Sequence, residues 1–103
     1  MAQLEQPQDA APGGDRFIVT VVGEDRVGII AAVSTLVAEA GGNILDIRQG
    51  IMQEFFVMTM MVDLAEASVS FDDLRSRLIA KGEELRLRID AQHEDVFKYM
   101  HRI

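Results

Sequence analysis

The residues of this chain that could do chemistry gather in one short stretch, Gly23-Glu-Asp-Arg-Val-Gly28, between an apolar run and a segment with helical spacing. We expect Asp25 to cap that helix, because a short carboxylate can accept a hydrogen bond from a first-turn amide. The amides of residues 26–29 would then converge at a helix N-terminus, which favours an anion such as a carboxylate. Gly28 has no side chain, so a ligand or another backbone could approach it. A tight strand-to-helix turn explains the same residues without any ligand.

Asn43 is a second candidate for ligand contact. It directly follows the pair Gly41-Gly42 and opens a segment of alternating polarity. Its side-chain amide could hold a polar group of a ligand. It could equally be a turn residue that tolerates left-handed backbone geometry.

Catalytic and metal chemistry is not indicated elsewhere in the chain. His93 and His101 are eight positions apart, about 12 Å along a helix, which is too far for one metal ion. The chain has no cysteine, which excludes disulfides, thiolate metal sites and cysteine nucleophiles. No Ser/His/Asp constellation or carboxylate pair stands out. We therefore expect no enzyme, no metal and no cofactor.

The length and net charge of the chain indicate how many domains it forms and which partners do not suit it. A chain of 103 residues suits one domain. Its formal net charge of −7 opposes binding to nucleic acid and to anionic membrane surfaces. No apolar run reaches the roughly 18 residues of a membrane span, and the first residues lack a signal-peptide pattern. We expect a cytoplasmic protein whose residues 1–15, rich in Gln, Ala, Pro, Gly and Asp, form a disordered tail.

The elements that must position these residues follow from hydrophobic periodicity. Strands are predicted over residues 16–22, 43–52, 55–63 and 85–91. Helices are predicted to begin at Ile29 and Phe71; the first stops at Gly41-Gly42, and the second starts at an N-cap, Ser70, and ends near Gly82. A short C-terminal helix is predicted from apolar residues that share one face: Val96, Phe97, Met100 and Ile103.

This order predicts an α+β, ferredoxin-like βαββαβ fold. It has a four-stranded antiparallel sheet, two helices on one face and the short C-terminal helix. The strands over 16–22 and 55–63 would be central, because they are apolar almost throughout while the other two alternate. Both faces of the central strands are then apolar, so the face without helices must be covered. We expect the C-terminal helix and a second subunit, hence a homodimer, to cover it.

Three functions known for this fold do not suit the residues. A metal chaperone needs a cysteine pair, and the chain has none. An acylphosphatase needs a phosphate-cradling arginine, but Arg26 lacks the surrounding glycine-rich signature. An RNA-recognition module needs exposed aromatic residues on a basic surface. The adjacent Phe55 and Phe56 point to opposite faces, and the chain is acidic.

Residues 21–49 resemble the signature of the ACT domain, a small regulatory βαββαβ module that binds amino acids and related effectors. The shared pattern is an apolar strand, a G-x-D-x-x-G loop ending at Gly28, a helix, and Asn43-Ile44 opening the next strand. The resemblance covers residues 16–103, expected to form a single ACT domain. It is strongest to short stand-alone ACT proteins and to the domains of the glycine-cleavage-system transcriptional repressor. Many ACT domains have proline where this chain has Val27.

The resemblance implies a small-molecule effector bound at a homodimer interface. The net negative charge argues against a direct nucleic-acid or membrane partner. The loop before the first helix would supply backbone amides, and the start of the second strand an asparagine side chain. The ligand-binding residues implied in this way are Asp25, Arg26, Val27, Gly28, Asn43 and Ile44. The alternative is a ligand-free dimerisation or protein-interaction module.

Overall fold

The computed structural model describes residues 16–95, which fold into one sheet and two helices. The elements in chain order are β2 (Arg16–Glu24), α1 (Ile29–Glu39), β3 (Asn43–Met52), β4 (Phe55–Asp63), α2 (Phe71–Leu85) and β5 (Leu87–His93). The predicted N-terminal tail and C-terminal helix lie outside the described residues. Neither α1 nor α2 is long and apolar enough to cross a membrane, within the part of the chain that the structure describes.

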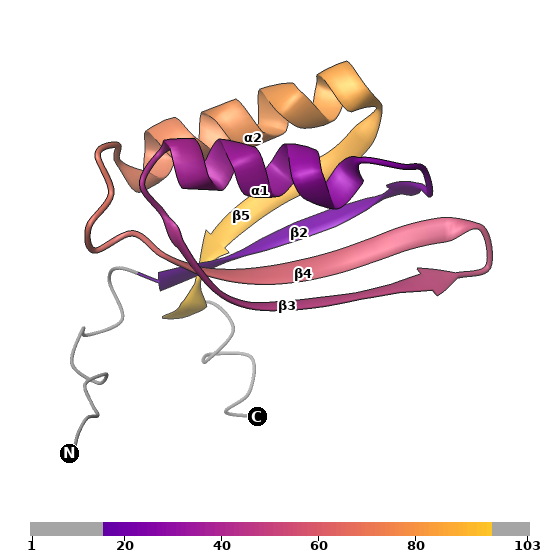
Figure 1. Ribbon diagram of the computed structural model, residues 1–103, viewed down its shortest axis with the longest axis horizontal. Helices are drawn as coiled ribbons and strands as arrows, with labels where there is room; N and C mark the ends of the chain where they lie inside the picture. Colours follow the sequence, from indigo (N-terminus) through magenta and orange to yellow (C-terminus); the bar gives the residue numbers. More distant parts are fainter. Residues whose placement is uncertain (1–15, 96–103) are drawn as a thin grey trace, which may run out of the picture.

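The sheet confirms the predicted topology. Its strand order is β3-β4-β2-β5, and every neighbouring pair is antiparallel. The predicted central strands, β2 and β4, are therefore flanked on both sides. Both helices cover the same face of the sheet (Figure 1), with α1 over β3 and α2 over β5. This is the ferredoxin-like α+β arrangement that the sequence predicts.

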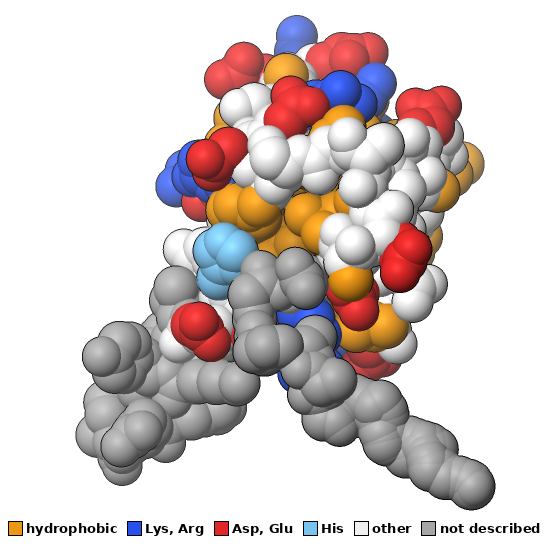
Figure 2. All heavy atoms as spheres, turned by 90° about the vertical axis from the view of Figure 1, so that its left-hand side faces the viewer, with side chains coloured by type: hydrophobic (Ala, Val, Ile, Leu, Met, Phe, Trp, Pro, Cys, Tyr) orange, Lys and Arg blue, Asp and Glu red, His pale blue; other side chains and the backbone are white. Residues whose placement is uncertain are grey.

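The core lies between the sheet and the helices. The inward residues of the central strands are fully buried, and they pack against the apolar stripes of the two helices. The strand residues are Phe17, Val19, Val21, Phe56, Met58, Met60 and Val62. Seen from the end where β2 begins, charged side chains gather over the helix layer with apolar side chains beneath them (Figure 2). Fully burying one such apolar side chain stabilises the fold by about 1.5–3 kcal/mol.

Glycines end α1 as the sequence predicts. Gly41 has a left-handed φ of 84°, and its N–H donates to the Ala38 carbonyl at 2.9 Å. The Gly42 N–H donates to the Val37 carbonyl at 3.0 Å. These two bonds form a Schellman motif, which satisfies carbonyls that the end of a helix otherwise leaves unpaired.

The predicted end of the second helix is wrong. Helix α2 continues past Gly82 and ends at Leu85, and its C-cap residue is Arg86, whose φ is 61°. Gly82 is a packing residue rather than a stop: a Cβ there would lie 2.7 Å from the Leu87 carbonyl oxygen. Strand β5 accordingly starts at Leu87 instead of residue 85, although its predicted alternation is confirmed from Leu87 onward.

Candidate functional site

The loop between β2 and α1 leaves the helix N-terminus open. Gly28 is the N-cap residue, with a left-handed φ of 95°, and no side chain caps the helix. The predicted cap by Asp25 is therefore wrong: that residue lies three positions before the N-cap, whereas a capping side chain belongs to the N-cap residue itself. A Cβ built on Gly28 would have no atom within 4 Å, and the neighbouring Val27 is fully exposed. The loop offers free space beside the first-turn amides of α1.

Helix α2 provides an internal comparison. Its N-cap, Ser70, accepts a hydrogen bond from the Asp73 N–H at 3.1 Å. Two carboxylates, Asp72 and Asp73, lie in its first turn, where they complement the positive end of the helix dipole. Helix α1 has no acidic residue in its first turn and no side-chain cap. Of the two helices described, α1 is thus the one whose N-terminus lacks an internal anion.

The side chain of Arg26 contacts the C-terminal end of α2. Its guanidinium donates a hydrogen bond to the carbonyl of Leu85, the last residue of α2. Helix α2 has no basic residue in its own last turn, so Arg26 supplies a cation to the negative end of that helix. This contact ties the loop to the α2–β5 turn.

Asn43 and Ile44 lie at the end of the sheet opposite to the loop of residues 25–28. Asn43 pairs with Asp63, which in turn pairs with Arg16 at the start of β2. The loop at Gly28 follows Glu24, at the end of β2. The two groups are separated by the length of α1, whose 11 residues rise about 16 Å. Within one chain, the structure brings residues 25–28 together but does not bring Asn43 to them.

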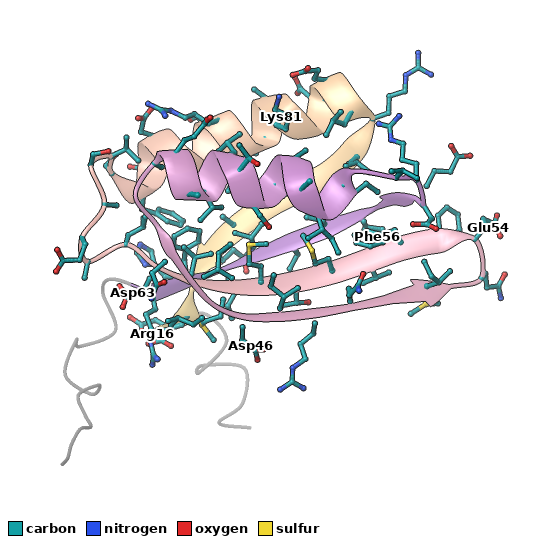
Figure 3. All side chains as sticks on the ribbon, viewed as in Figure 1. Arg16, Asp46, Glu54, Phe56, Asp63 and Lys81 are labelled. Atoms are coloured by element: carbon teal, nitrogen blue, oxygen red, sulfur yellow. The ribbon has the colours of Figure 1, made fainter. Side chains whose placement is uncertain are left out.

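The two residues also face different sides of the sheet. Ile44 pairs with Val62 and packs partly against the core on the helix side. Because side chains alternate along a strand, the Asn43 side chain points toward the other face. Figure 3 shows Asp63 and Arg16 at that end of the sheet and Glu54 at the far end.

Strand β3 is an exposed edge. Nine of its ten residues are exposed, and only Ile44 is partly buried. Two of the exposed residues, Ile47 and Ile51, are apolar and lie on the helix side, opposite Met60 and Phe56. An edge strand of this length with free backbone groups and apolar side chains is a template for another strand.

Sequence reasoning missed several features of this region. The contact from Arg26 to Leu85 spans 59 positions, and no local pattern encodes it. The exposure of nearly all of β3 was missed as well, because alternating polarity is typical of a half-buried strand. Among residues 16–95, no three His, Asp or Glu side chains lie close enough to hold a metal ion.

Comparison with known proteins places this geometry in a family. The model of the ACT domain matches residues 15–92. A UPF0237 protein from Methanocaldococcus jannaschii is 51% identical over 88 residues, covering 85% of this chain and 98% of the relative. An ACT domain protein from Streptococcus pneumoniae superposes with a TM-score of 0.72 at 38% identity, covering 81% of this chain and 93% of that one.

A putative glycine cleavage system transcriptional repressor of known structure is also similar. Its TM-score is 0.68 at 27% identity, and the match covers 76% of this chain and 44% of that protein. The family model spans every described helix and strand up to residue 92 in β5. The chain belongs to the ACT domain family.

Proposed function

We propose that this ACT domain is a regulatory module that binds an amino acid, or a similar small effector with a carboxylate, at a homodimer interface. The observation that carries the proposal is the N-terminus of α1, which has neither a side-chain cap nor a first-turn acid. The effector carboxylate would accept hydrogen bonds from the first-turn amides, as anions do at helix N-termini. The open space at Gly28 admits it, and Asp25, Arg26 and Val27 shape the loop.

A second subunit would complete the site. In one chain Asn43 lies about one helix length from the loop, at the opposite end of the sheet. If β3 paired with β3 of a second copy in antiparallel fashion, the first residues of one strand would lie beside the last residues of the other. Asn43 and Ile44 of the partner subunit would then reach the end of the sheet where residues 25–28 lie. The exposed β3 edge supports this arrangement.

The first experiment is a thermal-shift screen of the wild-type protein against the twenty amino acids. An effector at a hundredfold excess over its Kd adds about 2.7 kcal/mol to the free energy of unfolding. Asn43→Ala should weaken the binding of the effector, because a polar group of the ligand loses its hydrogen-bond partner. The stability of the free protein should change little. Gln49→Ala, on the same exposed strand, is the matched control and should bind normally.

Mixing two defective variants tests whether the site spans two chains. Gly28→Asn blocks the loop of its own chain, and Asn43→Ala removes the side chain given to the partner's loop. In a mixed dimer one site carries both defects and the other carries neither, so random pairing restores about a quarter of the sites. Calorimetry that shows no recovery in the mixture would place both residues outside a shared site.

A ligand-free dimerisation module is the second candidate function. The apolar edge residues Ile47 and Ile51 favour it, since self-association through β3 needs no small molecule. The two functions separate cleanly in experiment. A dimer by sedimentation that no amino acid stabilises supports the dimerisation module and rejects the effector site.

A further inference from the structure

The sheet face opposite the helices carries an exposed apolar patch at its hairpin end. This hairpin patch consists of the exposed residues Val22, Met52 and Phe55 together with the half-buried Val57. The register places Val22 beside Val57 and Met52 beside Phe55. Met52 is 65% exposed and Phe55 is 46% exposed, in contrast to Phe56, which points to the core and is 4% exposed. Large apolar side chains grouped in this way mark an interaction surface.

A depression with a volume of about 340 Å³ adjoins the patch. It lies over Gly50, which pairs with Val57, and its walls include Arg48, Met52 and Thr59. A Cβ built on Gly50 would have no atom within 4 Å, and its φ is not left-handed. The missing side chain therefore creates a hollow in which one apolar side chain of a partner could sit, as the anchor residues of protein interfaces do.

Charge is distributed unevenly around the patch. Glu24 pairs directly with Phe55, and Asp25 and Glu54 lie next to these two residues in the chain. None of the three carboxylates forms an ion pair with any residue of 16–95. Of the nearby cations, Arg48 is paired with Asp46 at 3.3 Å, and Arg88 lies beside Val22 on β5. The outer end of the patch, toward the hairpin tip (Figure 3), is therefore acidic.

We propose that the hairpin patch docks an amphipathic basic helix of another protein. One apolar side chain of that helix would fill the hollow over Gly50, and its Lys or Arg residues would lie over Glu24, Asp25 and Glu54. A helix suits this surface because a sheet face packs against helices, whereas a strand would add to the β3 edge. Pairing through the β3 edge extends the sheet sideways and keeps this face of it open, with Met52 next to the partner strand and Asp25 shared with the loop at Gly28. The peptide test below contains no amino-acid effector, so its outcome does not depend on the effector site.

The test uses a dye-labelled helical peptide of leucine and lysine at amphipathic spacing, and a second peptide in which glutamate replaces lysine. Binding to the full chain is followed by fluorescence anisotropy. The variant Gly50→Val fills the hollow without changing charge, and it should fold normally because valine favours strands. The matched control is Ala38→Val, which adds the same side chain at an exposed position of α1 that does not line the depression.

We expect the basic peptide to bind the wild type and Ala38→Val alike, and Gly50→Val at least about tenfold more weakly. The acidic peptide should not bind. Methyl NMR of the wild type should show shifts that centre on Val22, Met52 and Val57. Equal binding to Gly50→Val, or shifts centred on the helices, would overturn the proposal. A molecular mass in solution that is dimeric for the wild type and monomeric for Gly50→Val would also overturn it, because the occupant of the patch would then be a second copy of this chain.

Discussion

Replacing Gly28 separates the backbone role of this residue from its role at the effector site. Its φ of 95° lies in the left-handed region, where an ordinary side chain costs roughly 1–2 kcal/mol and a β-branched one more. No neighbouring atom lies within 4 Å of its Cβ position, so there is no steric clash to add. We therefore expect Gly28→Val to lower the free energy of unfolding by about 2 kcal/mol. Asparagine tolerates this region, so Gly28→Asn should cost less than about 1 kcal/mol.

The assay is urea and thermal unfolding followed by circular dichroism. In a domain of this size about 2 kcal/mol lowers the midpoint of thermal unfolding by roughly 8–16 °C. Both variants place a side chain in the approach to the α1 amides, so any amino acid that stabilises the wild type should fail to stabilise either. A valine variant as stable as the wild type would refute the backbone argument. An asparagine variant that retains the effector response would refute the site.

Three further substitutions test packing and capping. Ser70→Ala removes the bond to the Asp73 N–H, and urea unfolding should show a loss of about 1 kcal/mol. Gly82→Ala should destabilise by about 1–2 kcal/mol despite the better helix propensity of alanine, because its Cβ meets the Leu87 carbonyl oxygen at 2.7 Å; a more stable variant would contradict this. Arg86 has a left-handed φ of 61°, which glycine adopts without strain, so Arg86→Gly should raise the free energy of unfolding by about 0.5–1 kcal/mol. The measurement is the midpoint of thermal unfolding, which should rise.

The periodicity of the sequence was sufficient to predict the fold. The nearly continuous apolar central strands, the alternating edge strands and the one-sided helical spacing agree with a single topology. Burial was harder to predict, because β3 alternates and yet is exposed at nine of its ten residues. Element ends were harder to predict, since a glycine such as Gly82 can stop a helix or allow close packing. Only the three-dimensional contact with β5 shows which role it has. Asp25 failed as a cap for a similar reason: spacing cannot tell whether the N-cap is that residue or Gly28.

The candidate site was predictable as a set of residues but not as an arrangement. Local sequence identified the loop at residues 25–28 and the start of β3 as separate candidates. Their position at opposite ends of the sheet follows from α1, which returns the chain to the end where β2 begins. The hollow at Gly50 had no signal in the sequence, because a missing side chain matters only where its neighbours leave space.

The sheet order has a consequence for how the protein is made. Strand β5 pairs only with β2, the first strand of the described chain, and Phe17 lies opposite His93. During synthesis β2 therefore waits with one edge open until almost the whole domain has emerged from the ribosome. Such pairing between distant segments slows folding and leaves unpaired strand edges exposed in the meantime. Nascent chains that stop before Leu87 should accordingly depend on chaperones, whereas release of residues through His93 allows the sheet to close.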